Sequence, residues 1–467
     1  MNATVELQDL AVWHGTRMLV SPLDLRFSAG EAITILGESG SGKSLLAHAI
    51  MGTTASNLKA SGVLRCEGRV YDLADPANRR QMWGREMAIL PQEPAIALDP
   101  TMRTLPQVAE GLRITPLAGK ADEHARERLG RLGLAGKEHH FPHTLSGGMA
   151  QRVAFAAATI SGARFLIADE PTKGLDSIAR DDLGELLREH VAQGNLLLTI
   201  THDIDLARQL GGRVLVMRDS EIVEQGSAEQ VLNHPREAYT RSLLAAAPAA
   251  WDDIEHASPG ELLIRARGLS KRFPPLTLFS DLHVDLHAGE RVALLAPSGT
   301  GKTTLGNVLL GLLPADAGSI RYAPHLKHGS MQKLYQDPVT AFAPRLTLRR
   351  AFEDLCRRHR LDTGLVGPFL ERLRLPAALL DRLPSQVSGG ELQRLALIRA
   401  LLLKPRVVFA DEPTSRLDPV TQKDTFRCLV EELKAVGCAL LLVTHDETLA
   451  AKTSHRTVRL ECDLVAA

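Results

Sequence analysis

The sequence AITILGESGSGKS (residues 32–44) decides the fold, because an apolar run leads directly into a glycine-rich loop that ends in Lys and Ser. In a GxxxxGK[ST] loop between a strand and a helix, backbone N–H groups surround a polyphosphate, and the lysine reaches its β- and γ-phosphates. The sequence RVALLAPSGTGKT (residues 291–303) repeats this order. The chain is therefore predicted to contain two phosphate-binding loops.

Each loop supplies a set of candidate phosphate-binding residues. These are Gly37, Ser39, Gly40, Gly42, Lys43 and Ser44 in the first copy, and Pro297, Ser298, Gly299, Gly301, Lys302, Thr303 and Thr304 in the second. The hydroxyls of Ser44 and Thr303 are placed to hold Mg²⁺. The second copy has Ala296 where the first has Gly37. Because glycine makes a tight turn without steric cost, we expect Ala296 to be tolerated only with a negative φ.

Four further motifs recur in the same order along the chain. They are LPQEPAIALDP and LYQDPVTAFAP, LSGGMAQR and VSGGELQR, FLIADEPTKGLD and VVFADEPTSRLD, and TITHD and LVTHD. Ser146 and Ser388 are 242 residues apart, as are Asp169 and Asp411. A repeat with nearly constant spacing indicates one duplicated domain.

The sequence between the copies, AAAPAAWDDIEHASPG (residues 245–260), is rich in small residues, prolines and acidic side chains. Such a composition is typical of a surface linker. We therefore predict a first domain over residues 1–250, a linker over residues 251–260 and a second domain over residues 261–467.

Bulk composition narrows the class of protein. A chain of 467 residues exceeds what one hydrophobic core usually supports. Lys and Arg together number 55, as do Asp and Glu, which leaves no net charge to attract nucleic acid or anionic lipid. Five scattered cysteines without a CxxC pair suit a reducing compartment. We find no signal-peptide pattern and no window approaching the roughly 18 apolar residues of a membrane span, so membrane work needs partner subunits.

Each copy alternates short apolar runs with helical stretches. In the first copy the runs cover residues 32–36, 165–168 and 196–200. This alternation predicts an α/β fold with a largely parallel sheet covered by helices. Ligands of such sheets bind beyond the carboxyl ends of the strands, which is where the motifs begin.

Two carboxylates end a buried strand in each copy. We expect Asp169 and Asp411 to hold Mg²⁺ through water, and Glu170 and Glu412 to orient and deprotonate the attacking water, the positioning that phosphoryl transfer requires. A pair of solvated acids after a strand would not explain why both copies place them 23 residues after the serine of their SGG.

Several other residues are candidates for contact with the nucleotide. His202 and His445 follow a β-rich run, from which an imidazole can reach the γ-phosphate. Gln92 and Gln336 can contact Mg²⁺ or water through a neutral amide. Trp13 and Phe273 precede their phosphate loops and are candidates to stack on adenine, with core packing as the alternative.

Together these motifs resemble the ATP-binding cassette family, because LSGGxxQR accompanies the phosphate loop and the Asp-Glu strand. The resemblance implies two P-loop NTPase domains, each with a mainly parallel core sheet, an antiparallel β subdomain and a helical subdomain. It also implies head-to-tail pairing of the two halves around two ATP molecules. Serine and glycine amides at a helix N-terminus form an anion site. The implied signature residues are Ser146, Gly147 and Gly148 at the site of Lys302, and Ser388, Gly389 and Gly390 at the site of Lys43.

Two features are similar to the importers of oligopeptides, dipeptides and nickel. One is the pair of Gln-containing sequences, and the other is VLNHPREAYTRSLLAAAP (residues 231–248), which resembles their His-Pro-Tyr-Thr tail. The resemblance implies an ATPase at the cytoplasmic face of the inner membrane, with two permease subunits and an external solute-binding protein as partners. It also implies that Asp176 and Asp418 couple the two sites. The tail lacks the Cys cluster of some relatives, so no iron–sulfur centre is predicted.

Two alternatives lie outside transport. Tandem cassettes also occur in ribosome-associated and DNA-repair ATPases, but these usually bring basic inserts or zinc modules. Here the linker is short and acidic and no Cys pairs occur, so no nucleic-acid partner is expected. Cassette subunits of complexes that break down phosphonates carry similar tails, and this alternative stays open.

Overall fold

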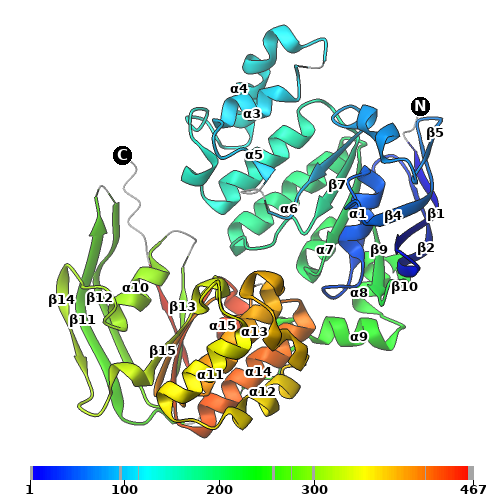
Figure 1. The fold of residues 1–467 in the computed structure, drawn as a ribbon. Coiled ribbons are helices and arrows are strands. Elements are labelled where there is room, and N and C mark those ends of the chain that lie inside the picture. Colours follow the sequence, from blue (N-terminus) through cyan, green and yellow to red (C-terminus); the bar gives the residue numbers. More distant parts are fainter. Residues whose placement is uncertain are drawn as a thin grey trace. The chain divides into compact units, whose positions relative to one another are not determined.

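The computed structural model describes residues 4–93, 97–113, 115–254, 258–274, 276–296, 300–415 and 417–460. The chain forms two compact units, Met1–Ala245 and Ala246–Ala467, which Figure 1 colours from blue to green and from green to red. Each unit has a mainly parallel core sheet, an antiparallel sheet and a group of helices, so the predicted fold class is confirmed.

The core sheet of the first unit has six strands in the order β10-β9-β3-β8-β7-β6. Their bounds are β3 (Ala32–Leu36), β6 (Met87–Leu90), β7 (Phe165–Asp169), β8 (Leu196–Thr201), β9 (Arg213–Arg218) and β10 (Glu221–Ser227). All pairs are parallel except β9 with β10. Every residue of β3, β7 and β8 is buried, as expected of parallel strands covered on both faces.

The second sheet of the first unit is antiparallel, in the order β2-β1-β4-β5. It consists of β1 (Val5–His14), β2 (Arg17–Phe27), β4 (Leu58–Cys66) and β5 (Arg69–Asp72). With α1 (Lys43–Met51) it covers one face of the core sheet, where Phe27, Leu46 and Ile33 share one apolar cluster.

The other face is covered by helices. These are α3 (Thr104–Glu110), α4 (Ala121–Arg131), α5 (Gly147–Thr159) and α6 (Ser177–Ala192), and the apolar cluster beneath them includes Leu129, Phe155 and Leu166. The unit is completed by α7 (Ile204–Leu210), α8 (Ala228–Asn233) and α9 (Ala238–Ala245), and by the 3₁₀ turns η1 (Pro76–Met82), η2 (Ala118–Lys120) and η3 (Pro142–Thr144).

The second unit repeats this plan with a core sheet in the order β15-β16-β17-β13-β18, all parallel. The strands are β13 (Arg291–Leu295), β15 (Met331–Leu334), β16 (Val407–Asp411), β17 (Ala439–Thr444) and β18 (Arg456–Arg459). Its antiparallel sheet contains β11 (Leu262–Phe273), β12 (Leu276–His287) and β14 (Ala317–Tyr322).

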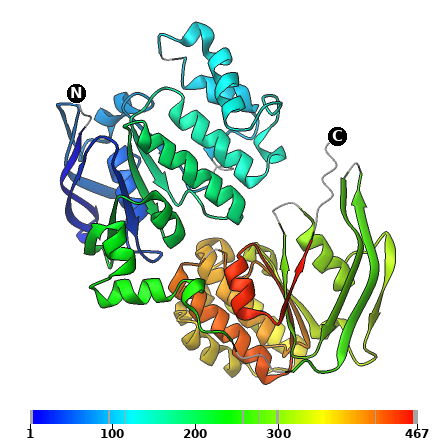
Figure 2. The same cartoon turned by 180° about the vertical axis from the view of Figure 1, so that it is seen from behind.

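The helices of the second unit again divide between the two faces. Helix α10 (Lys302–Leu309) lies with the antiparallel sheet on one face of the core sheet. The other face is covered by α11 (Leu348–His359), α12 (Val366–Arg372), α13 (Gly389–Leu401) and α14 (Pro419–Ala435). Helix α15 (Glu447–Thr453) follows β17. Figures 1 and 2 show this core sheet between its antiparallel sheet and the helices. The 3₁₀ turns are η4 (Pro248–Ala250), η5 (His328–Ser330), η6 (Pro338–Ala341), η7 (Thr363–Leu365), η8 (Ala377–Asp381) and η9 (Pro384–Gln386).

The junction between the units differs in one respect from the predicted linker. Trp251 is only 6% exposed, and its ring centroid lies 5.7 Å from that of Phe426. Its Nε1 donates a hydrogen bond to the Ala246 carbonyl at 2.8 Å. An indole packed in this way belongs to the core of the second unit rather than to a surface linker, because a large apolar ring gains most from burial. Residues 255–257 of the predicted linker lie outside the described residues.

Among the helices that the structure describes, none is both long and apolar enough to span a bilayer.

Candidate nucleotide sites

The first phosphate loop joins the carboxyl end of β3 to the N-terminus of α1. Gly42 is the N-cap of α1 with φ of 102°, and a Cβ there would lie 2.9 Å from the Leu19 carbonyl oxygen, so only glycine fits. No side chain caps this helix. The first-turn N–H groups of α1 therefore suit a phosphate.

Lys43 begins α1 and is 5% exposed. Its Nζ donates hydrogen bonds to the carbonyl oxygens of Gly37 at 2.7 Å and Glu38 at 2.8 Å. The ammonium thus lies inside the curve of the loop, where it can exchange its hydrogen bonds to the two carbonyl oxygens for bonds to phosphate oxygens. Ser39 and Gly40 are exposed on the same loop, and a Cβ on Gly40 would meet no atom within 4 Å.

The second loop has the same frame between β13 and α10. Gly301 is the N-cap with φ of 91°, again without a side-chain cap, and Thr304 lies in the first turn of α10. Lys302 Nζ donates to the Ala296 carbonyl at 2.6 Å and lies 4.0 Å from Glu412 Oε1. The candidate residues Pro297, Ser298 and Gly299 lie outside the described residues.

Ala296 does not have a positive φ in this structure, as a residue with a Cβ at this position requires. Gly37 does not have a positive φ either, but a Cβ there would lie 2.3 Å from the Met217 carbonyl oxygen. The first loop therefore needs glycine because of a neighbouring strand, not because of its own turn.

The hydroxyl after each lysine meets the aspartate that ends a core strand. Ser44 Oγ donates to Asp169 Oδ1 at 3.0 Å, and Thr303 Oγ1 donates to Asp411 Oδ2 at 2.5 Å. Burial raises the pKa of Asp169, against the hydrogen bond from Ser44, and the pKa of Asp411 is raised in the same way. A hydroxyl and a carboxylate together offer the hard oxygen ligands that suit Mg²⁺.

Glu170 and Glu412 have an unusual backbone conformation. Their φ angles are 46° and 47°, in the left-handed region that non-glycine residues seldom occupy. Backbone bonds hold them there, since the N–H of Glu170 donates to the Ile200 carbonyl at 2.7 Å and that of Glu412 to the Val443 carbonyl at 3.0 Å. Such strain persists where surrounding structure imposes it and is typical of functional sites.

Each of these glutamates pairs with the histidine of its THD motif. His202 Nδ1 lies 2.9 Å from Glu170 Oε2, and His445 Nδ1 lies 3.3 Å from Glu412 Oε1. Burial opposes ionisation of Glu170, but the charge and hydrogen bonds of His202 outweigh it and lower the pKa of Glu170. The hydrogen bond and charge of His445 likewise overcome burial and lower the pKa of Glu412. Both carboxylates are therefore held ionised and oriented.

The two sites differ in their supporting contacts. In the first, Thr201 Oγ1 donates to Glu170 Oε2 at 3.2 Å. In the second, Gln336 Nε2 donates to Glu412 Oε2 at 3.1 Å. Gln92 follows β6 and forms no side-chain hydrogen bond within the described part of the chain. Motif comparison did not single out Thr201, although it belongs to TITHD.

The signature serines cap long helices. Ser146 is the N-cap of α5 and accepts from the Met149 N–H at 3.3 Å. Ser388 is the N-cap of α13, where its hydroxyl also donates to the Glu391 carboxylate at 2.6 Å. Both serines are exposed. Among the described residues, neither shares a hydrogen bond with the phosphate loop of its own unit.

The candidate glycines and the two coupling aspartates lie at the N-termini of helices. Gly147, Gly148, Gly389 and Gly390 form the first turns of α5 and α13. Asp176 is the N-cap of α6 and accepts from the Ala179 N–H at 2.9 Å, and Asp418 caps α14 through the Thr421 N–H at 3.0 Å.

The two aromatic candidates end strands of the antiparallel sheets. Trp13 is half-buried near the end of β1. Phe273 ends β11, is 49% exposed and lies 5.5 Å from the Lys271 ammonium. Stacking of either ring on adenine stays a prediction.

The sequence reasoning missed one contact at the first phosphate loop. The Tyr239 hydroxyl on α9 accepts a hydrogen bond from the Glu38 N–H at 3.3 Å, and Arg218 lies 5.0 Å above its ring. The tail that contains Tyr239 was noted only as a family mark. Among the residues described, the second unit has no helix that corresponds to α9.

Two phosphate loops, each facing a buried Asp-Glu pair and a histidine, define a P-loop nucleotide hydrolase with two sites. A family model described as "ABC transporter" matches residues 20–173 and 279–415. Curated relatives include the "Glutathione import ATP-binding protein GsiA" of Salmonella typhi, 32% identical over 94% of this chain and 81% of the relative. The protein of the same name from Escherichia coli K12 is 32% identical over 97% and 83%. The chain belongs to the ABC transporter family, and it is an ATP-binding ATPase with two fused nucleotide-binding domains.

The solved structures agree on the fold. The archaeal ribosome recycling factor aABCE1 superposes with a TM-score of 0.68 at 20% identity, over 97% of this chain and 87% of its own. A structure described as "RNase-L Inhibitor" gives 0.66 at 20% identity. At this identity the likeness concerns the fold alone.

Proposed function

We propose that this chain is the ATP-hydrolysing subunit of an importer for peptides, nickel or a related small solute, and that it acts at the cytoplasmic face of the inner membrane. The observation that carries the proposal is its 32% identity, over almost the whole chain, to two proteins named for glutathione import. Glutathione is a small peptide, so the names of these relatives favour peptides over nickel. Two integral membrane permeases and an external solute-binding protein are the partners that such a subunit requires.

The residues of each unit suit ATP hydrolysis with Mg²⁺. The ion, when bound, neutralises charge on the β- and γ-phosphate oxygens, and Ser44 with Asp169 would hold it in the first unit. Lys43 would exchange its loop carbonyls for phosphate oxygens. Glu170, which is ionised and held in orientation by its contact with His202, would orient the attacking water and accept its proton.

We further propose that both ATP sites are composite. Ser388, Gly389 and Gly390 would complete the site of Lys43, and Ser146, Gly147 and Gly148 would complete that of Lys302. Both serines are exposed at helix N-termini, which supports a role toward a phosphate supplied from outside their own unit.

The transport proposal can be tested by capture from native membranes. The double variant Glu170→Gln/Glu412→Gln should bind ATP without hydrolysing it, and we expect it to co-purify with two membrane subunits. Uptake of labelled glutathione, a dipeptide and Ni²⁺ would then be compared in cells with and without the chain. Loss of peptide uptake alone supports the favoured solute. If the chain instead purifies without membrane subunits, as part of a complex of soluble enzymes, this result would support the alternative that it belongs to a complex that breaks down phosphonates.

A further inference from the structure

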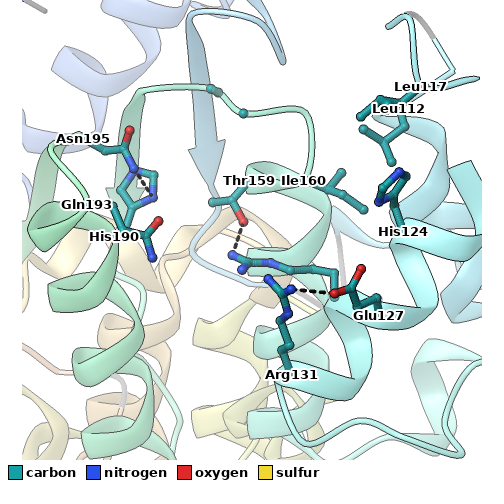
Figure 3. Close-up of a pocket in the computed structure, with 13 residues that line it drawn as sticks. Leu112, Leu117, His124, Glu127, Arg131, Thr159, Ile160, His190, Gln193 and Asn195 are labelled. Carbon is teal, nitrogen blue, oxygen red and sulfur yellow. Dashed lines mark hydrogen bonds and ion pairs between the residues drawn. The ribbon is translucent and has the colours of Figure 1, made fainter.

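A pocket of about 270 Å³ lies within the first unit, and its lining includes no residue of that unit's phosphate loop (Figure 3). It is lined by residues of α4, by the end of α5 and by the end of α6 with the turn that follows. The polar side chains that matter are Arg128 and Arg131 on α4, Thr159 on α5, His190 on α6, and Asn195 before β8. None of them belongs to the nucleotide machinery.

Arg128 and His190 are held in place against one aromatic ring. The Arg128 guanidinium lies 5.5 Å from the centroid of Phe155, and the His190 ring meets the same ring edge-on at 6.4 Å. Arg128 Nη2 also donates to Thr159 Oγ1 at 2.9 Å. Arg128 and His190 therefore contact the same aromatic ring.

Each of these side chains has a buried nitrogen that bonds to no group in the described part of the chain. These atoms are Arg128 Nε and His190 Nε2. His190 is 6% exposed, and its Nδ1 lies 3.5 Å from the Asn195 amide nitrogen. If that amide donates, the tautomer has its proton on Nε2, so both buried atoms are N–H donors.

The charge of the lining is positive at neutral pH. Burial and the nearby Arg128 charge lower the pKa of His190 to about 4, so the ring is neutral. Arg131 is paired with Glu127 at 2.5 Å. Burial lowers the pKa of Arg128 too, yet a guanidinium stays charged in proteins. The lining carboxylate of Glu127 pairs with Arg131 and forms no ion pair with Arg128, on which the charge of Glu189 acts from outside the lining.

The second unit provides an internal comparison. Matching the last residues of equivalent helices along the sequence pairs Phe369 with Arg128, Leu401 with Thr159 and Leu433 with His190, and the same offset pairs Cys438 with Asn195. Leu401, Leu433 and Cys438 are at most 6% exposed and belong to the apolar core, with Phe369 packed against it. One copy of the domain fills this position with apolar side chains, whereas the other lines it with polar ones.

We propose that the pocket binds a small anion, the carboxylate or phosphoryl group of a metabolite, attracted by the Arg128 charge, and that a small rotation of Arg128 and His190 turns their unsatisfied N–H groups toward it. A hydrogen bond from a guanidinium to such an anion is charge-assisted and therefore short and strong. A ligand there would tie α4, within the helical segment of residues 101–142, to α6 beside the core sheet. It is a site for a ligand other than the nucleotide or the transported solute.

Calorimetric titration of the full-length protein tests this proposal. The protein is first saturated with a non-hydrolysable MgATP analogue, so that the β- and γ-phosphate positions of both loops are occupied, and is then titrated with inorganic phosphate and with succinate. We expect one site per chain, with affinity at least about tenfold weaker in Arg128→Met and in His190→Leu. Arg126→Met is the matched control, because Arg126 is exposed on the same helix and does not line the pocket.

The two probes separate the possible sources of the anion. Binding of phosphate alone identifies a phosphoryl group, and binding of succinate alone identifies a carboxylate. The conservative variants Arg128→Lys and His190→Gln keep the test decisive if the first pair fails to fold. The proposal is overturned if neither probe binds the wild type, or if Arg126→Met weakens binding as much as Arg128→Met does.

Discussion

The two nucleotide sites of this chain have the same arrangement of candidate reacting groups but different supporting contacts. Both have a lysine at a helix N-terminus, a hydroxyl bonded to a buried aspartate, and a strained glutamate paired with histidine. Around the first glutamate the extra donor is Thr201, and around the second it is Gln336. After a duplication, the reacting groups keep their positions while the contacts that hold them diverge, because several neighbours can supply the same hydrogen bond.

The phosphate loops show the same contrast. The first loop packs Gly37 against the Met217 carbonyl and donates a hydrogen bond from the Glu38 N–H to the Tyr239 hydroxyl, whereas the second loop has Ala296 at the position of Gly37. Whether the two sites are equivalent in turnover is therefore the question on which the following predictions bear.

The largest effect is expected from the glutamates. Glu170→Gln and Glu412→Gln each remove a base, so each single variant should lose most of the steady-state ATPase activity, and the double variant should fall by at least about 10²-fold. ATP binding, measured by equilibrium dialysis, should persist in all three. If Glu412→Gln leaves turnover nearly intact, the Ala296 site is regulatory and the sites are not equivalent. Glu189→Gln is the control, because Glu189 lies exposed on α6.

The next effect concerns stability and pH in the polar pocket of the first unit. His190 has a pKa near 4 in the folded protein and about 6.5 when unfolded, so only the unfolded chain takes up a proton between these values. The contribution of His190 to the free energy of unfolding is therefore fully present above about pH 6.5 and is lost as the pH falls toward 4. The loss between pH 7 and pH 5 is about 2 kcal/mol.

His190→Leu introduces the residue that the second unit has at this place, and it should remove that part of the pH dependence. Thermal unfolding of wild type and variant at pH 7 and pH 5 measures the difference. Arg128, His124, Glu127 and Arg131 also line the pocket and remain in both proteins. Equal losses in both proteins would show that His190 is not the group that titrates.

An effect of similar size on stability is expected from exchanging the first residue of each phosphate loop. Gly37→Ala brings a Cβ to 2.3 Å from the Met217 carbonyl oxygen, an overpacking that should cost about 2 kcal/mol. Ala296→Gly is the matched control and should change stability by less than about 1 kcal/mol. Chemical denaturation of both variants checks this, and equal tolerance would mean that the first loop shifts to make room.

The smallest effect is expected at the tail. Tyr239→Phe removes the acceptor of the Glu38 N–H, which should cost about 1 kcal/mol and weaken ATP binding about fivefold at the first site only. A fluorescent ATP analogue measures this in the Glu170→Gln/Glu412→Gln background. Unchanged affinity would mean that water replaces the hydroxyl.

Much of the site was predictable because its chemistry constrains residue type at fixed spacing. Asp169 ends a core strand, and Lys43, Glu170 and His202 come after the ends of core strands. Parallel strands end at the same edge of a sheet. Residues up to 159 positions apart in sequence therefore meet, and the motifs alone indicated which ones.

The tertiary structure decided what motif spacing does not encode. The duplication, the two phosphate loops and the paired carboxylates follow from the sequence by itself, since backbone phosphate binding requires glycines and a lysine in a set order. The burial of Trp251, the contact of Tyr239 with the first loop, and the polar pocket around Arg128 and His190 required the fold. These features depend on which side chains from distant segments share one volume, and packing of that kind leaves no periodic signal along the chain.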